Sequence, residues 1–228
     1  MLYSLSREGA KLPEGFWEQI QKRWDRENGG KWRDSFNIAP TQFTPILRKT
    51  EHDLSISNLR WGLVPSWAED EKIGSSLVNG RAETAFEKPA FRDAMHKRRC
   101  LIPASGFYEW RQLGPKEKQP YYFRLPTGAP FFIAGLWERW GPTNIETFTL
   151  LTREADATVR PIHHRMPVIL EPADVDVWMN STSPSDQIRE VLQPRSSGLE
   201  TFPVSSRVNS PRNDSPDLLN PAQPETLF

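Results

Sequence analysis

Proline is the feature of this sequence that most limits its fold, because 21 prolines are spread over 228 residues. That share is about twice the ~5% that is usual in proteins. Proline lacks a backbone N–H and fixes φ, so it ends helices and is confined to the edges of sheets. Pro40, Pro45 and Pro65 already interrupt the first part of the chain. We therefore expect a loop-rich domain of short strands with few long helices.

The core has to form by packing alone, since the chain contains one cysteine, Cys100. A single thiol excludes an internal disulfide and any zinc site that needs two thiolates. Nine Trp, 12 Phe and 4 Tyr supply large side chains, and each removes roughly 150–250 Å² from water when buried. Cys100 precedes an apolar stretch, which favours a small core side chain over a nucleophile.

Charge and hydropathy limit the class of protein. The 29 basic residues balance the 29 acidic ones, so the formal net charge is 0. No apolar run approaches the ~18 residues that span a bilayer, and the first residues lack the basic and apolar regions of a secretory signal. The four histidines do not have the spacing of metal ligands. We expect a cytoplasmic protein with no membrane partner, metal or cofactor.

The helices predicted from the sequence are few. Apolar residues at a spacing of four predict one over residues 14–28. Another is predicted to begin at Pro89, since proline is tolerated at the first helical position. Two short helices are expected at residues 172–179 and 184–192, the latter with Ser183 as its N-cap.

Short strands dominate the rest of the chain. They are expected at residues 43–48, 54–61, 148–152 and 166–170, with a hairpin joining 121–125 to 131–137 through a Pro-Thr-Gly turn. From Arg195 onward the chain is rich in Ser, Pro and Asn, and we expect it to wrap the body as irregular structure. The sequence predicts a single α+β domain.

Polar groups that could carry chemistry interrupt three stretches that are otherwise apolar or turn-like. The sequence has no Gly-rich phosphate loop and no G-x-S-x-G motif, which disfavours nucleotide-dependent enzymes and ordinary serine hydrolases. The three polar residues are Asn79, Glu109 and His163. Burial would raise the pKa of a carboxyl such as Glu109 and make it a proton donor. Taken singly, Asn79 could satisfy a turn, Glu109 could pair with an arginine, and His163 could be a hydrogen-bonded core residue.

Six ordered motifs together resemble one family. They read Phe-Asn-Ile-Ala-Pro at 36–40, Trp-Gly-Leu-Val-Pro-Ser-Trp at 61–67, Asn-Gly-Arg-Ala-Glu-Thr at 79–84, Arg-Cys-Leu-Ile-Pro-Ala-Ser-Gly-Phe-Tyr-Glu-Trp at 99–110, Ile-His-His-Arg-Met-Pro at 162–167 and Val-Ser-Ser-Arg-Val-Asn at 204–209. This set is similar to the SOS-response-associated peptidase (SRAP) domain family. The resemblance implies one β-rich α+β domain over residues 1–221, with short strands in a curved, barrel-like sheet and a few peripheral helices. Residues 222–228 would form a tail.

The resemblance also implies a function in the response to DNA damage. Members of the family sense abasic sites in single-stranded DNA, and their N-terminal cysteine captures the lesion aldehyde as a thiazolidine. By resemblance, Asn79 would orient the N-terminal amine, Glu109 would act as acid and base, and His163 would pass protons to the sugar oxygen. The residues expected to hold DNA are Arg81 and Arg165 on phosphates, and Trp67 and Pro40 against bases. The partner would be abasic single-stranded DNA, bound by a monomer.

The sequence departs from the family pattern at Leu2, which stands where the resemblance implies the cysteine nucleophile. Leucine has no thiol, so we expect no thiazolidine from this chain. A large second residue is also expected to block removal of the initiator Met. The sequence leaves open whether Leu2 is natural, introduced, a sequencing error or the product of a misassigned start.

Three alternatives to covalent capture are consistent with the sequence. The first is a module that binds DNA lesions without a covalent bond. The second is a peptidase that processes its own N-terminus with Glu109 and His163. The third is a structural domain without a site, in which changes at Asn79, Glu109 and His163 would alter stability alone.

Overall fold

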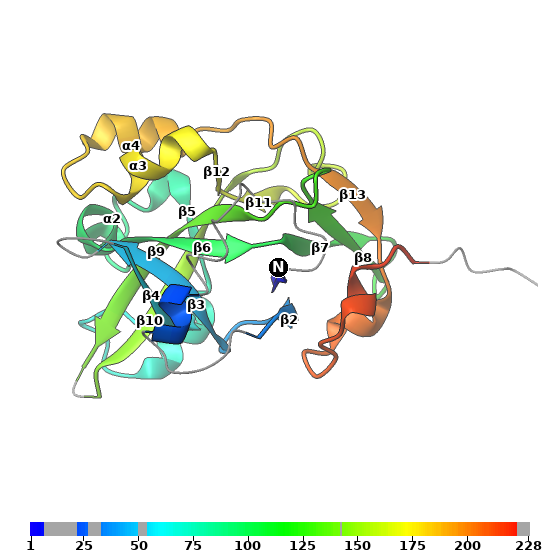
Figure 1. Cartoon of the computed structure of the whole chain (residues 1–228), viewed down its shortest axis with the longest axis horizontal. Helices are drawn as coiled ribbons and strands as arrows, with labels where there is room; N and C mark the ends of the chain where they lie inside the picture. Colours follow the sequence, from blue (N-terminus) through cyan, green and yellow to red (C-terminus); the bar gives the residue numbers. More distant parts are fainter. Residues whose placement is uncertain (7–21, 27–32, 50–53, 142, 223–228) are drawn as a thin grey trace, which may run out of the picture.

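Five strands pair in a closed ring and form the barrel of the fold (Figure 1). The computed structural model describes residues 1–6, 22–26, 33–49, 54–141 and 143–222. Around the barrel the order is β10–β4–β3–β6–β9 and back to β10, and only the β4–β10 pair is parallel. The strands are β3 (Phe43–Lys49), β4 (Leu54–Trp61), β6 (Arg99–Ala104), β9 (Phe131–Trp140) and β10 (Ile145–Glu154).

A second, antiparallel sheet stands beside the barrel and contains the start of the chain. Its order is β13–β8–β7–β1–β2. The strands are β1 (Leu2–Leu5), β2 (Ser35–Ile38), β7 (Gly106–Gln112), β8 (Lys118–Arg124) and β13 (Glu200–Pro203). Only Ser105 separates β6 from β7, so the chain passes directly from the barrel into the second sheet.

Short elements complete the fold. Three more strands extend the barrel: β5 (Asn79–Arg81) and β11 (Arg165–Pro167) pair with β10, and β12 (Ile169–Leu170) pairs with β9. The helices are α2 (Arg92–Lys97), α3 (Val175–Met179) and α4 (Ser185–Val191), with 3-10 turns η1 (Glu71–Ser76), η2 (Ala82–Thr84), η3 (Pro172–Asp174), η4 (Ser206–Asn209) and η5 (Pro216–Leu219). In the parts of the chain that the structure describes, no helix is long and apolar enough to cross a membrane.

The barrel core is aromatic and aliphatic, as the composition predicts. Trp61 is buried between Tyr3 and Phe148, with ring centroids 5.3 and 6.2 Å away. Every residue of β6 is buried, and Cys100 lies among them with no exposed surface. Burial raises the pKa of the Cys100 thiol, so it stays protonated. The prediction of a β-rich α+β fold with a barrel-like sheet and a core cysteine is confirmed.

The predicted hairpin between residues 121–125 and 131–137 is wrong, although both strands exist. The expected turn at residues 125–128 is present, and in it the N–H of Gly128 donates to the oxygen of Leu125 at 2.9 Å. However, β8 pairs with β7 and β13, whereas β9 pairs with β6, β10 and β12. Local turn residues set the bend in the chain, but burial of each strand against distant partners decides which sheet it joins.

Other predicted boundaries shift at the ends of elements. The second helix begins at Arg92 and not at Pro89, and Pro184 is the N-cap of α4 in place of Ser183. The chain after Arg195 is not wholly irregular, since β13 pairs with β8. Of the helix expected at 14–28, only residues 22–26 are described, and they are helical. The rest of that helix and residues 223–228 lie outside the described residues, and the domain end at 221 stays a prediction.

Gly106 is required at the start of β7, where its backbone lies against β8. A Cβ on this residue would collide with the ring and hydroxyl of Tyr122 and lie 2.5 Å from the oxygen of Phe123. We expect Gly106→Ala to lower the free energy of unfolding by about 1–3 kcal/mol, because overpacking forces neighbours to move. Urea unfolding measures this change. Gly114→Ala is the control, since its Cβ would meet nothing closer than Glu117 at 3.9 Å, and equal losses in both variants would contradict the explanation.

Candidate active site at the start of the chain

The register of β1 on β7 brings the first residue of the chain to Glu109. Leu2 lies opposite Tyr108, and Ser4 lies opposite Gly106. Because the strands are antiparallel, the residue before Leu2 continues toward the residue after Tyr108. The α-amine nitrogen of Met1 is accordingly 4.0 Å from Oε1 of Glu109. The amine of Met1, and not Leu2, is therefore the group next to this carboxyl.

The side chain of Leu2 packs away from that contact. It covers a small buried cluster beside the main core. The members of this cluster are Tyr108, Tyr122, Val204, Val208 and Leu218. The assignment of Leu2 to the position of the family nucleophile stays a prediction, whereas its place in the fold is that of an apolar packing residue.

Glu109 is a buried carboxyl with a raised pKa. The residue is 4% exposed, and burial is the main cause of the shift, since it penalises the charged form. The positive charges of the Met1 amine and of His163 oppose the shift, and so does the hydrogen bond from the N–H of Trp110. The net direction is upward, so the carboxyl holds its proton to a higher pH than an exposed glutamate does. Such a group can donate a proton over a wider pH range than an exposed glutamate can.

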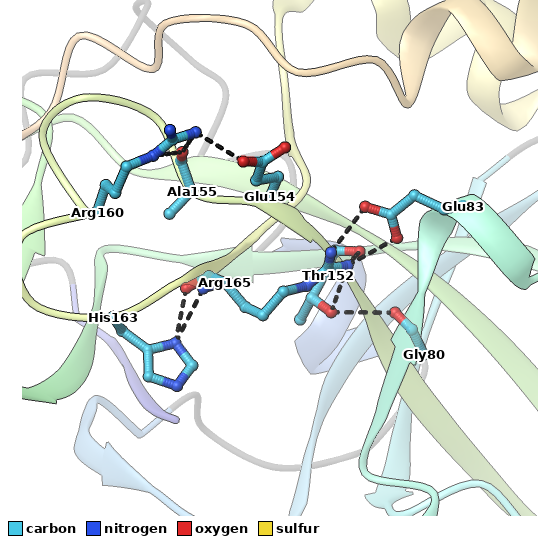
Figure 2. A network of polar contacts seen from close by, with 8 residues as sticks. All are labelled: Gly80, Glu83, Thr152, Glu154, Ala155, Arg160, His163 and Arg165. Atoms are coloured by element: carbon cyan, nitrogen blue, oxygen red, sulfur yellow. Dashed lines mark hydrogen bonds and ion pairs between the residues drawn. The ribbon is translucent and has the colours of Figure 1, made fainter.

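His163 faces the same carboxyl from the segment between β10 and β11. Its Nδ1 is 3.8 Å from Oε1 of Glu109. The same nitrogen lies 2.9 Å from the backbone oxygen of Arg165 and 3.1 Å from its N–H, as Figure 2 shows. A proton on Nδ1 is donated to that oxygen, and the other tautomer accepts from the N–H. The backbone of Arg165 thus holds the imidazole in place in either neutral form.

These groups line an open pocket of about 570 Å³. The lining residues are Met1, Glu109, Trp110, Lys116, Lys118, His163 and Asn209. The sequence reasoning assigned no role to Trp110, Asn209 or the two lysines. Trp110 and Asn209 belong to motifs at 99–110 and 204–209, so the motifs contained a signal for them. Lys116 lies in the turn between β7 and β8, and Lys118 is the first residue of β8, so their position beside Glu109 depends on the pairing of the two strands.

Arg165 is already paired in the structure. Its guanidinium donates to both carboxylate oxygens of Glu83, at 2.7 and 2.8 Å, and to the backbone oxygen of Thr152 at 2.6 Å. The hydrogen bond and charge of Arg165 lower the pKa of Glu83. Thr152 in turn donates to the oxygen of Gly80 at 3.3 Å. Figure 2 shows the side chain of Arg165 pointing away from His163 toward β5 and η2. The backbone of Arg165 contacts His163 and its side chain contacts Glu83 of η2, so this residue links the site to η2.

The other expected site residues lie outside this pocket. Asn79 and Arg81 are exposed on the same face of β5, because Gly80 between them is buried. Trp67 is 58% exposed, with Nε1 3.5 Å from the oxygen of Pro89, and Pro40 is half-buried. In the described part of the chain, no hydrogen bond or ion pair joins Asn79 to Glu109 or His163. The roles expected for these residues stay predictions.

The fold and site define a class of small β-barrel proteins in which the chain start meets a carboxyl and an imidazole in one pocket. The chain belongs to the SOS response associated peptidase (SRAP) family, whose model matches residues 4–211. The family predicted from the six sequence motifs is therefore confirmed.

Three relatives illustrate the similarity. The chain is 41% identical over 196 residues to abasic site processing protein YoqW of Bacillus subtilis (strain 168), covering 83% of this chain and 87% of that protein. It is 30% identical over 239 residues to abasic site processing protein HMCES of Gallus gallus, covering 89% and 70%. It also matches the crystal structure of a protein from Bacteroides thetaiotaomicron with a TM-score of 0.72 and 29% identity, covering 80% and 82%.

Proposed function

We propose that this chain recognises abasic sites in single-stranded DNA as part of the response to DNA damage. The observation that carries the proposal is the convergence of the Met1 amine, Glu109 and His163 in one open pocket. Membership of the SRAP family and similarity to two abasic site processing proteins support it. We further propose that the protein works as a monomer in the cytoplasm, where it meets the nucleoid DNA.

The chemistry that fits these groups is capture of the lesion aldehyde by an amine. The unprotonated nitrogen of Met1 attacks C1′ of the ring-opened sugar. A C–N bond forms as the C=O π bond breaks, and a proton passes from the nitrogen to the former carbonyl oxygen, which becomes a hydroxyl. The protonated carboxyl of Glu109 donates to the departing hydroxyl, water leaves, and an imine results. Glu109 recovers its proton from the nitrogen, and His163 passes protons to the sugar oxygen during ring opening. Addition of water reverses the same steps.

The absence of a thiol at Leu2 limits this chemistry to the imine. A thiazolidine needs a thiol on the residue that supplies the amine. Here that residue is Met1, whose sulfur is a thioether, and Leu2 after it has no sulfur. The adduct of this chain is therefore reversible and sensitive to water. Asn79 is proposed to orient the amine once DNA is bound, since the amide of an asparagine both donates and accepts hydrogen bonds.

DNA contacts are proposed on the surface near β5. Arg81 is exposed and would contact a phosphate, and Trp67 and Pro40 would stack against bases. Arg165 can bind a phosphate only after it releases Glu83, because its guanidinium already donates to both carboxylate oxygens of Glu83. With no net charge on the chain, binding depends on these local contacts and is weakened by salt.

Affinity for a damaged strand tests the proposed recognition. Fluorescence anisotropy compares a single-stranded oligonucleotide with one tetrahydrofuran abasic analogue, which has no aldehyde, and the same strand undamaged. We expect tighter binding of the abasic strand, since the pocket admits a sugar without a base. Equal affinity for the two strands would contradict the proposal.

Placing a thiol at position 2 distinguishes the imine adduct from a thiazolidine adduct. Leu2→Cys is expected to lose Met1 and to form a heat-stable adduct with abasic DNA without added reductant. The unchanged chain is expected to give an adduct only when borohydride reduces the imine. Intact-mass spectrometry distinguishes these results, and a heat-stable adduct on the unchanged chain would show that its chemistry does not stop at the imine.

A further inference from the structure

The β7–β8 hairpin forms one wall of the pocket and has no assigned role. Trp110 lies on β7, and Lys116 and Lys118 follow in the turn and at the start of β8. The turn is held by its own backbone, since the N–H of Leu113 donates to the oxygen of Glu117 at 3.0 Å. Both lysines are exposed. The lysines therefore stand at the mouth of the pocket that has Glu109 at its inner side.

Trp110 gives this wall a fixed position. Its indole Nε1 donates to Oδ1 of Asn209 at 2.8 Å, and its ring packs on the small cluster that Leu2 also covers. Asn209 is the last residue of η4, so the contact ties the hairpin to the C-terminal part of the chain. A wall that is already ordered loses little entropy when a ligand packs against it.

The charge at this pocket is positive, although the whole chain has none. The lining groups include the ammonium of Met1 and the ammonium groups of Lys116 and Lys118. Glu109 is the one carboxyl among the lining residues, and burial favours its neutral form. Within the described residues neither lysine makes an ion pair with an acidic side chain. This mouth is therefore a place where an anionic group would gain from binding.

We propose that Lys116 and Lys118 bind a backbone phosphate of the DNA strand beside the lesion, with the adjacent sugar against Trp110. This inference rests on the proposed function and adds a second contact surface, separate from Arg81 and Trp67. A lesion sugar that reaches Glu109 leaves its flanking phosphates at the mouth of the pocket, because a phosphate is too polar to enter the buried floor. The hairpin lysines are the cations at that mouth.

The salt dependence of DNA binding tests this proposal. Fluorescence anisotropy is measured from about 50 to 200 mM salt with the single-stranded tetrahydrofuran oligonucleotide, which cannot react covalently. The double variant K116A/K118A is expected to bind about tenfold more weakly, with a salt slope smaller by about 0.7, since one phosphate contact contributes ~0.7 on single strands. The pair K116R/K118R is expected to keep the affinity and the slope.

Lys97→Ala is the matched control. Lys97 is an exposed lysine at the end of α2, on the far side of the molecule from β7 and β8 (Figure 1). An unchanged affinity and slope in K116A/K118A would overturn the proposal, and so would an equal loss in the Lys97 control. Loss of binding to abasic and undamaged strands alike, with no preference in the unchanged protein, would support the lysine contacts while rejecting abasic-site recognition. Thermal unfolding of each variant shows whether the fold is intact.

Discussion

Glu109→Gln is expected to slow imine formation with an abasic site by about 100- to 10,000-fold, the usual contribution of a positioned proton donor. The amide keeps the shape of the side chain but cannot give a proton to the departing hydroxyl. Because the change adds no bulk and no charge, the affinity for tetrahydrofuran DNA should stay within a few-fold of that of the unchanged protein. Borohydride trapping over time measures the rate.

The rate of imine formation should depend on pH differently in the unchanged protein and in Glu109→Gln. An amine attacks only when unprotonated, so the rate should first rise with pH in both proteins. In the unchanged protein it should fall again as pH passes the raised pKa of Glu109, because the proton donor is then lost. The Gln variant should show no such fall. A variant that traps DNA at the original rate would exclude Glu109 as the donor, and Glu117→Gln, on the exposed hairpin, is the control.

Glu109→Gln should not lower the stability of the fold, although it lowers the rate of imine formation. A carboxyl whose pKa is raised in the folded state stabilises the fold below its ordinary pKa, and this contribution is lost as pH rises through the raised pKa. Glutamine stays neutral throughout. Glu109→Gln should therefore unfold at the same or a higher temperature at about pH 8, which shows that the loss of trapping is not a loss of folding.

Arg99→Met is expected to lower the free energy of unfolding by about 3–5 kcal/mol, since it removes a buried charge that satisfies several other groups. The guanidinium donates to the oxygens of Trp178, Asn180 and Met95, at 2.6, 2.6 and 2.5 Å. These carbonyls lie at the ends of α2 and α3, so one side chain caps two helices. The methionine would leave those carbonyls without a partner. Urea unfolding gives the free energy.

Arg92→Met provides the comparison on the same helix. Arg92 is exposed, and among the described residues its guanidinium pairs with the neighbouring Asp93 alone, at 3.5 Å, so its removal should cost less than about 0.5 kcal/mol. A loss below about 1 kcal/mol in the Arg99 variant would mean that the capping of α2 and α3 contributes little to stability. The burial of Arg99 lowers the pKa of its guanidinium, yet arginine stays charged in proteins at all ordinary pH values.

The strands that the sequence predicted well are those whose pattern is local. The run at 54–61 is β4 with the same boundaries, and that at 43–48 is β3, one residue longer. The alternation that identifies such strands needs no knowledge of a partner. The pairing of β8 and β9 does need it, and the local turn between them indicated the wrong sheet.

The site was predictable only in part for the same reason. Glu109 and His163 were singled out as polar residues among apolar ones, and the structure brings them within 3.8 Å. The periodicity of the sequence could not show that Met1 would join them, because this depends on the register of β1 on β7. It also could not show that Glu83 occupies Arg165, since that contact joins η2 to β11 across the barrel edge. Contacts that form through the pairing of distant strands cannot be predicted from the local pattern of apolar and polar residues.

Reductive trapping followed by mapping of the attachment site shows which amine of the chain captures the lesion. The unchanged protein is incubated with a single-stranded oligonucleotide containing one abasic site, borohydride is added, and the adduct is digested and mapped by mass spectrometry. We expect one oligonucleotide per chain, attached to the α-amine of Met1. No adduct, or an adduct on a lysine such as Lys116 or Lys118, would contradict the assignment of the Met1 amine beside Glu109 as the group that captures the lesion.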